Sequence, residues 1–378
     1  MAEKEREKTE SFKTTQEWKR LRQERKAQKR KLREEKLIQK VEKEQARVRE
    51  EEQKKAKLEQ EEQEKLILGR NYTVSIALPG SILDNAQSPH LRTYLAGQIA
   101  RAAAMFNIDE IVIFDELGQM SKTTEGYFVG MWKKGESNVQ LARVLQYLEC
   151  PHYLRKYFFP NHPDLKYAGL LNALDSPHHM RLEEESLYRE GVVLNKPVKP
   201  GKGSYVDVGL KKEVLIDRHL TQGLRVTIKI DNYHTEKKNI KGTVVAPSAP
   251  RTDNGVYWGY TVRLANSIGS VFTECPYKGG YDLIIGTSER GDSVDSFIVP
   301  SFKHAMIVFG GMKGLEASLE ADEKLQIDDP RCLFHYYLNT CPNQGIRTIR
   351  TEEAMLITMS ALRSKLHPDR VGTLDSAR

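Results

Sequence analysis

The sequence predicts an α/β protein that carries a small inserted β-barrel and is preceded by a long charged helix. Apolar strand-like runs alternate with helix-like segments at residues 70–190 and again at 280–378. Between these stretches, at 191–279, apolar residues recur at every second position and are separated by Pro and Gly clusters, a pattern typical of short half-buried strands. One α/β domain interrupted by a barrel explains both patterns.

Residues 1–69 form the charged arm. From Ser11 to Leu68 the chain lacks Gly and Pro and is rich in strong helix formers, which favours a long helix. Its apolar residues are too irregular for a sustained heptad seam, so a solvated helix, a weak coiled coil and a disordered arm all remain open. Between Lys13 and Arg33 there are ten bases and two acids, which is typical of a phosphate-binding or nuclear-import segment but also of a solvated helix face.

The first half of the α/β domain opens with a β-α-β unit. The run YTVSIALP (72–79) predicts a strand, residues 91–106 a helix, and EIVIFDE (110–116) a second strand. A further helix is expected at 139–149.

Three alternating runs, at 206–210, 226–230 and 260–264, predict strands of the inserted barrel. A barrel of this size resembles the OB fold, which often holds nucleic acid. Its basic residues are candidates for phosphate contacts: Lys202, Lys211, Lys212, Arg225 and Lys229. The aromatic residues Tyr205, Tyr233, Tyr257 and Trp258 either stack on bases or belong to the barrel core.

Three glycine-containing loops in the last hundred residues follow apolar runs or lead into the final helix. They are GTSERGDS (286–293) after the strand YDLIIG, GGMKG (310–314) after HAMIVF, and NTCPNQGIRTIRTEEA (339–354), in which Thr351 is the expected N-cap of a helix at 351–362. Loops at the carboxyl ends of neighbouring parallel strands meet at one edge, so a single pocket is expected. None has the form of a phosphate loop or a dinucleotide fingerprint, which disfavours ATP hydrolysis and ordinary dinucleotide binding.

Charge and cysteine content exclude several classes of protein. Of the formal net charge of +7, the first 68 residues contribute +5, from 22 bases and 17 acids, so the remainder is nearly neutral. The four cysteines form no CxxC pair, which argues against a disulfide scaffold and for a reducing, intracellular compartment. The cluster Cys150, His152, His162, His178 and His179 matches no common zinc spacing, so no metal is expected. Because no stretch approaches the roughly 20 apolar residues of a membrane span, we expect a soluble protein without membrane contacts.

The three loops, together with the opening VSIALPGSILDNAQSPHLRTYLAGQIARAA, resemble the SPOUT superfamily of knotted methyltransferases, and specifically its eukaryotic and archaeal branch. The resemblance covers residues 71–378. It implies a trefoil knot, S-adenosyl-L-methionine bound in a bent form, S-adenosyl-L-homocysteine as product, and a homodimer. The closing GIRTIRTEEA is similar to that of bacterial enzymes that methylate uridine N3, so the resemblance implies a base-directed methyltransferase of large-subunit ribosomal RNA; ribose 2′-O methylation remains open.

The resemblance also places the site residues. It puts the cofactor against Gly286, Thr287, Arg290, Gly310, Gly311, Gly314, Asn339, Thr340, Gly345 and Ile346. Arg290 is expected to orient the substrate or stabilise charge. Glu289 and Asp292 are weak candidate bases, because a solvated loop carboxylate is the favoured explanation of each acid. Arg347 and Arg350 are expected to contact RNA.

A second hypothesis is an interaction protein in which the basic arm binds RNA, chromatin or the cytoskeleton and the knot serves as a scaffold. The nucleus or nucleolus is the expected location, with the cytoplasm and the mitotic spindle as alternatives.

Overall fold

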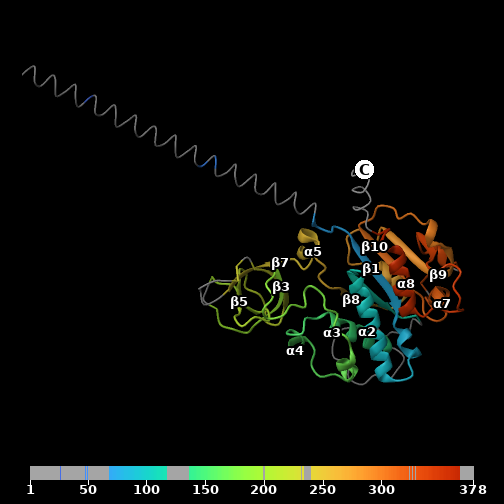
Figure 1. The fold of residues 1–378 in the computed structure, drawn as a ribbon, viewed down its shortest axis with the longest axis horizontal. Coiled ribbons are helices and arrows are strands. Elements are labelled where there is room, and N and C mark those ends of the chain that lie inside the picture. The colour runs from blue at the N-terminus through green and yellow to red at the C-terminus, as the bar shows by residue number, and fades with distance from the viewer. Residues whose placement is uncertain are drawn as a thin grey trace, which may run out of the picture. The chain divides into compact units, whose positions relative to one another are not determined.

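The computed structural model describes residues 68–116, 136–198, 201–230, 232–233, 240–322, 324–325, 327 and 329–366, together with the single positions 26, 47 and 49. The expected arm and its basic segment therefore lie outside the described residues, apart from those three helical positions and the last two residues of the arm, Leu68 and Gly69. From Leu68 onward the chain forms one unit, which contains a parallel sheet with its helices and a separate barrel (Figure 1).

Six parallel strands form the sheet in the order β11-β9-β10-β1-β2-β8. Every residue of the neighbouring strands β1 and β2 is buried, which explains why they read as continuous apolar runs rather than alternating ones. The strand bounds are β1 (Thr73–Pro79), β2 (Glu110–Phe114), β8 (Thr261–Ala265), β9 (Leu283–Ser293), β10 (His304–Val308) and β11 (Tyr336–Asn339).

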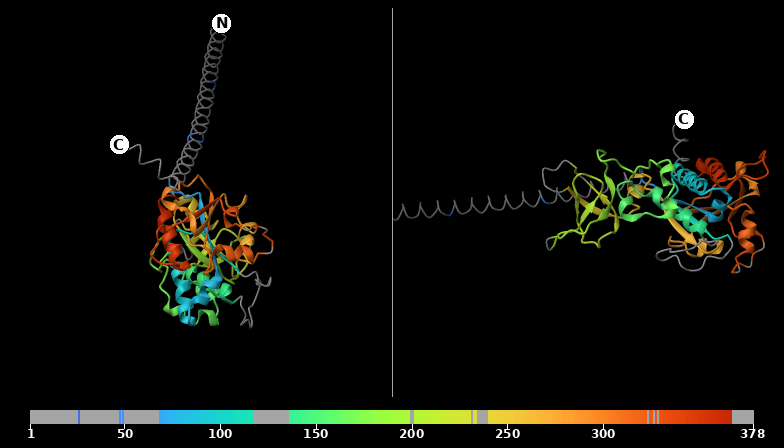
Figure 2. Two further views of the ribbon diagram at one scale, coloured as in Figure 1. Left: turned by 90° about the vertical axis from the view of Figure 1, so that its right-hand side faces the viewer. Right: turned by 90° about the horizontal axis from the view of Figure 1, so that it is seen from below.

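Helices cover both faces of the sheet. One face packs against α2 (Pro89–Met105), α3 (Glu136–Glu149) and α8 (Thr351–Arg363), whose buried side chains join those of the strands in the larger core. The other face packs against α6 (Ile268–Thr273) and α7 (Gly314–Glu320). Figure 2 shows α2 and α8 side by side. The shorter helical segments are η1 (Gly80–Asn85), α4 (Arg155–Phe158), η2 (Pro163–Leu165), η3 (Ala168–Leu170), α5 (Ala249–Asn254), η4 (Val294–Ser296) and η5 (Pro330–Cys332).

The expected barrel is present and closed, with the strand order β3-β4-β5-β7-β6. All neighbouring strands are antiparallel except β5 and β7, which are parallel. Its core contains mainly β-branched side chains from alternate strand positions, such as Val206, Val214 and Ile228. The strands are β3 (Tyr188–Val193), β4 (Tyr205–Asp207), β5 (Val214–Ile216), β6 (Arg225–Lys229) and β7 (Ile240–Val245).

One strand assignment from the sequence is wrong. Residues 260–264 were expected in the barrel, but β8 pairs with β2 and forms the edge of the parallel sheet. An edge strand that is half-buried alternates in the same way as a barrel strand, so the pattern could not separate the two. The barrel strands therefore run only from Tyr188 to Val245.

Two local details of the C-terminal half also differ from expectation. The run 286–293 belongs to β9 rather than to a free loop. The N-cap of α8 is Arg350, whose backbone N–H donates to Glu353 Oε2 at 3.0 Å. Thr351 lies inside the first turn, and its hydroxyl donates to the Gly310 carbonyl at 3.1 Å. The Thr351 hydroxyl therefore bonds to a residue distant in the sequence and does not cap α8, contrary to what the local pattern had predicted.

The segment from β11 to Lys365, just past the end of α8, contacts the connections that follow β9 and β10. Lys365 Nζ donates to the carbonyls of Val294 and Phe297, both at 2.8 Å and both in the β9–β10 connection. Thr351 reaches Gly310, on the connection after β10. A trefoil knot requires the C-terminal segment to pass through an earlier loop, so contacts on both sides of this segment agree with the expected knot. None of the helices that the structure describes combines the length and apolar character needed to cross a bilayer.

Candidate functional site

The carboxyl ends of β9, β10 and β11 meet at a cavity of about 330 Å³, so the three glycine-containing loops converge as expected. This volume is within the roughly 300–1,000 Å³ range of small-molecule sites. The lining comes from all three loops and from the first turns of α8. It comprises Thr287, Ser288, Glu289, Arg290, Phe309, Gly310, Gly311, Met312, Lys313, Gly314, Glu316, Asn339, Thr340, Cys341, Gln344, Arg347, Thr348, Ile349, Thr351, Ala354, Ile357 and Thr358.

A shift in strand register opens the wall formed by β9. Tyr337 pairs with Gly286, but the next residue of β11, Leu338, pairs with Asp292. The residues between Gly286 and Asp292 therefore have no partner on β11 in this pairing, and the first four of them, Thr287 to Arg290, line the cavity. Asn339 Nδ2 donates to the Glu289 carbonyl at 3.0 Å and holds the displaced segment in place.

The turn after β10 depends on glycine at two positions. A Cβ at Gly310 would lie 2.8 Å from the Gly314 carbonyl carbon and 2.9 Å from the Leu315 nitrogen, both backbone atoms that cannot move aside. Gly314 has φ of +78°, a left-handed conformation that side chains disfavour. The turn therefore brings backbone groups close together at the cavity wall, where a ligand can contact them.

Most of the residues proposed for the cofactor line this cavity, but three do not. Gly286 lies beneath the Phe334 ring, whose nearest atom would be 2.5 Å from an added Cβ. Gly345 and Ile346 are exposed, Ile346 by 57%. The residues that do line it are Thr287, Arg290, Gly310, Gly311, Gly314, Asn339 and Thr340.

The three proposed catalytic residues separate into different environments. Arg290 lines the cavity, is 72% exposed, and places Nη1 3.3 Å from Glu316 Oε1. Glu289 also lines the cavity and is exposed. Asp292 is absent from the lining and pairs with Leu338 in the strand register, so it is the weaker candidate base.

Sequence reasoning missed the part of the wall formed by helices. Ala354, Ile357 and Thr358 of α8 lie three and four positions apart and share one helix face that lines the cavity. That spacing was visible in the sequence, but only the fold shows that this face is turned toward the loops. Glu316 of α7 adds a carboxylate to the same cavity.

The cavity fits S-adenosylmethionine in chemical terms. The apolar side chains Phe309, Ile349 and Ile357 suit the adenine ring, while the close backbone turn at Gly310 offers polar main-chain groups. The Glu316 carboxylate can face the positive charges of the sulfonium and amino groups.

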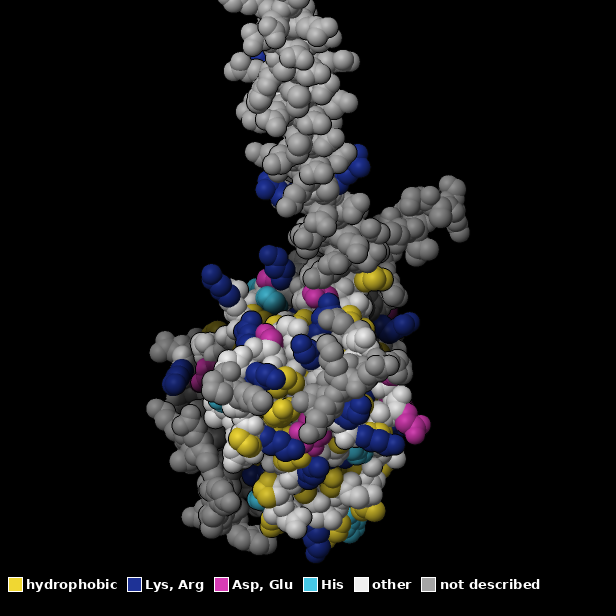
Figure 3. Space-filling model, turned by 90° about the vertical axis from the view of Figure 1, so that its left-hand side faces the viewer, with side chains coloured by type: hydrophobic (Ala, Val, Ile, Leu, Met, Phe, Trp, Pro, Cys, Tyr) yellow, Lys and Arg dark blue, Asp and Glu magenta, His cyan; other side chains and the backbone are white. Residues whose placement is uncertain are grey.

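The barrel carries most of its proposed RNA contacts on the surface. Lys202, Lys211 and Lys212 are exposed, and Lys229 is half-buried. Figure 3 shows Lys and Arg side chains spread over this side of the molecule, with few Asp and Glu among them. Arg347 and Arg350 are exposed on the loop before α8, and Arg347 also lines the cavity.

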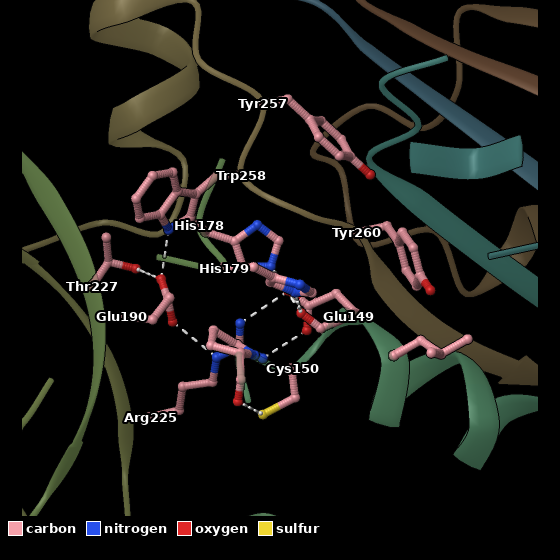
Figure 4. Close-up of polar contacts among 12 residues, drawn as sticks. Glu149, Cys150, His178, His179, Glu190, Arg225, Thr227, Tyr257, Trp258 and Tyr260 are labelled. Atoms are coloured by element: carbon pink, nitrogen blue, oxygen red, sulfur yellow. Dashed lines mark hydrogen bonds and ion pairs between the residues drawn. The ribbon is translucent and has the colours of Figure 1, made fainter. Parts of the chain in front are cut away.

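Arg225, which was predicted to contact RNA, forms ion pairs with two buried carboxylates while its own side chain stays 32% exposed. From β6 of the barrel, its guanidinium donates to both carboxylate oxygens of Glu149, at 2.7 and 2.9 Å, and its Nε donates to Glu190 at 2.8 Å (Figure 4). Glu149 ends α3 of the α/β domain, so this contact joins the two folds. We name Glu149, Glu190, Arg225, His178 and Trp258 the junction.

Other hydrogen bonds lie in and beside the junction. Glu190 Oε1 accepts from Trp258 Nε1 and from the Thr227 hydroxyl, both at 2.6 Å. Tyr257 is buried and donates to the Ile108 carbonyl at 3.0 Å. Trp258 and Tyr257 therefore have structural partners, but neither side chain belongs to the hydrophobic core of the barrel.

Electrostatics of the junction follow from its burial. Burial alone would raise the pKa of Glu149, but the hydrogen bond from His178, whose Nε2 lies 3.0 Å from Oε1, and the charge of Arg225 outweigh it and lower the pKa to about 2. Burial and the neighbouring His178 lower the pKa of His179 to about 3. Glu149 is thus an anion throughout the neutral range, as its ion pair requires.

Comparison with known proteins adds independent information. A family model described as "Putative RNA methyltransferase" matches residues 73–362. The chain is 62% identical over 299 residues to a 28S rRNA (uridine-N(3))-methyltransferase of Homo sapiens, covering 79% of this chain and 80% of that protein. It is also 62% identical to the protein of that name in Mus musculus, covering 79% and 78%, and 52% identical to that in Drosophila melanogaster, covering 78% and 63%.

Proposed function

The chain belongs to this family of RNA methyltransferases, and on that premise we propose that it methylates N3 of a uridine in large-subunit ribosomal RNA. Family membership confirms the expected enzyme class. The proposed substrate is supported by the 62% identity to uridine-N3 methyltransferases of 28S rRNA across 79% of the chain. The convergence of three loops at one cavity supports an active site in this part of the fold.

S-adenosylmethionine is the proposed methyl donor. Gly310, Gly311 and Gly314 would hold it through their backbone, with Thr287, Asn339 and Thr340 on the facing walls. Once bound, it supplies an electrophilic methyl group on a positively charged sulfur. The chain itself has to align the nucleophile and exclude water.

Arg290 is the proposed charge-stabilising residue. The uridine imide develops negative charge as it loses its proton, and an exposed guanidinium at the cavity can lie against it. Glu316, 3.3 Å away, orients the guanidinium at the rim. Lys202, Lys211 and Lys212 of the barrel, with Arg347 and Arg350, would hold the RNA backbone while the base is presented to the cavity.

A homodimer and a nucleolar location complete the proposal. The helices α2 and α8 border a second cavity, of about 230 Å³, and expose Tyr94, Met105 and Leu356, which form an apolar surface suited to a second copy. The nucleolus is where eukaryotic large-subunit RNA is made. The arm would add contacts to RNA, chromatin or the cytoskeleton.

Mass spectrometry of nucleosides from large-subunit rRNA tests the proposal directly. Cells that lack the protein should lose one N3-methyluridine, and the wild-type chain should restore it. The variant Arg290→Ala should bind S-adenosylhomocysteine in calorimetry yet restore at most about 1% of the product, as expected when charge stabilisation worth 10²–10³ is removed. Loss of a 2′-O-methylated nucleoside instead would overturn the assignment to the base, and full activity of Arg290→Ala would remove Arg290 from the mechanism.

A further inference from the structure

A carboxyl group that the proposed mechanism has not used lies at the carboxyl end of the central strands. Glu116 follows β2 by two residues, and Ser81 follows β1 by two residues. Ser81 Oγ donates to Glu116 Oε2 at 2.5 Å. In an open parallel sheet this edge is where ligands bind, and the turn after β10 lies beside it.

The carboxylate packs directly against the cavity wall. A Cβ at Gly311 would lie 2.4 Å from Glu116 Oε1 and 2.7 Å from Oε2, so only glycine at this position admits the carboxylate. Gly311 itself lines the cavity. Glu116 does not itself line the cavity, and a single residue without a side chain separates its carboxylate from the proposed cofactor site.

The two oxygens of this carboxylate are in different states. Oε2 accepts the Ser81 hydrogen bond, whereas Oε1 is buried and has no hydrogen-bond partner within the part of the chain that the structure describes. A buried acceptor without a donor costs roughly 1–3 kcal/mol. A general base needs a fixed orientation and an oxygen that can accept a proton. The Ser81 hydrogen bond fixes the carboxylate, and Oε1 is the oxygen that can accept.

We propose that Glu116 accepts the N3 proton of the target uridine and that Ser81 positions its carboxylate. The inference rests on the proposed uridine-N3 activity. At this edge uridine presents a single donor, N3–H, between two carbonyl oxygens, and a carboxylate oxygen is its complement. Cytosine presents a lone pair at N3, which the negative carboxylate repels, so the same group selects uridine over cytidine.

The proton step balances with groups already named. The N3 proton moves to Oε1 and leaves a neutral carboxylic acid, while the N–H electron pair stays on nitrogen. That pair forms the new N–C bond as the carbon–sulfur pair returns to sulfur. The acid gives its proton to water after the product leaves, which restores the carboxylate for the next cycle.

The variant Glu116→Gln in the full chain tests the inference. The amide keeps the size of the side chain but takes up no proton, so single-turnover methylation of unmodified large-subunit rRNA should fall at least about 100-fold, within the usual 10²–10⁴ of a general base. Binding of S-adenosylhomocysteine by calorimetry should stay within about twofold. Ser81→Ala should lower the rate less, by about tenfold. Glu320→Gln is the matched control, because this exposed carboxyl lies at the end of α7 outside the cavity lining.

A binding measurement provides a readout independent of turnover. With S-adenosylhomocysteine present, the wild-type protein should bind an RNA oligonucleotide of the mapped target sequence better than the same oligonucleotide with cytidine at the target. Glu116→Gln should lose this preference, since an amide can also donate to cytosine N3. A methylation rate of Glu116→Gln within threefold of the wild-type rate overturns the proposal. A loss of S-adenosylhomocysteine binding in this variant also overturns it, because Glu116 would then serve to shape the cofactor site. A wild-type protein that forms no N3-methyluridine would instead overturn the proposed function.

Discussion

The cavity and the junction use polar residues in opposite ways. The cavity is lined in part by glycine turns, and its ion pair between Arg290 and Glu316 is open to solvent. The junction buries Glu149 and Glu190 and pairs both with Arg225. Exposed pairs contribute little to stability, whereas a buried charge that loses its partner is strongly destabilising. We therefore expect substitutions in the cavity to change ligand binding and substitutions in the junction to change stability.

The largest expected effect is at the junction. Glu149→Ala leaves Arg225 and His178 without their shared carboxylate, and we expect a loss of about 3–5 kcal/mol in the free energy of unfolding. Urea denaturation followed by circular dichroism measures this loss. The matched variant in the cavity, Glu316→Ala, should cost no more than about 1 kcal/mol, because its partner Arg290 is exposed. Equal losses in both variants would break the contrast between the two regions.

Acid should weaken the junction through the protonation of Glu149. The pKa of Glu149 is about 2 in the folded protein, below its ordinary value of 4.5. Its contribution, on the order of 3 kcal/mol, is therefore complete above pH 4.5 and is lost as the pH falls toward 2. Unfolding free energies measured between pH 7 and pH 2.5 should show this decline, and it should be much smaller in Glu149→Gln, whose amide does not titrate. An identical decline in both proteins would show that other carboxyl groups cause it.

In the cavity we expect a loss of ligand affinity. Gly310→Val introduces atoms within 3 Å of the backbone at Gly314 and should weaken S-adenosylhomocysteine binding about 100-fold, or about 2.7 kcal/mol. Calorimetry measures the affinity, and circular dichroism checks that the fold is kept. Gly169→Ala is the control, because a Cβ there meets nothing within 4 Å. Unchanged affinity in Gly310→Val would mean that the cofactor binds elsewhere.

The smallest expected effect is on the exposed face of the barrel. Replacing Lys202, Lys211 and Lys212 together by alanine should weaken RNA binding about tenfold at moderate salt and reduce its salt dependence, because fewer counterions are released. Binding measured across a salt series tests this, and S-adenosylhomocysteine affinity should be unchanged. Arg225→Ala should instead lower stability, since its side chain serves the junction. A salt dependence equal to that of the wild type would place the RNA elsewhere.

Some elements could be predicted because their signals are local. The runs 72–79 and 110–116 are mostly apolar and show no strict alternation, since both faces of a central parallel strand are buried. The three loops could be expected to converge because the carboxyl ends of adjacent parallel strands meet at one edge.

Other assignments depended on partners that are distant in the sequence. Residues 260–264 alternate like a barrel strand, and only their pairing with β2 places them in the sheet.

Side-chain roles were harder to predict than strands. Arg225 was one of several barrel bases in the sequence, and nothing near it in the chain reveals that Glu149, 76 positions earlier, would neutralise it. Glu116 was overlooked for the same reason, since its relation to Gly311 arises only where β2 and β10 flank β1.

The amino-acid sequence by itself determined the four strands β1, β2, β9 and β10 of the sheet, the helices α2, α3 and α8, the presence of a barrel and the identity of the three cavity loops. These depend on hydrophobic periodicity and on glycine, which act between neighbours in the chain. The tertiary structure alone decided which charges are buried, which oxygen of Glu116 is left to accept, and to which sheet β8 belongs. Those outcomes depend on the desolvation and pairing of groups far apart in the chain, and no local pattern encodes them.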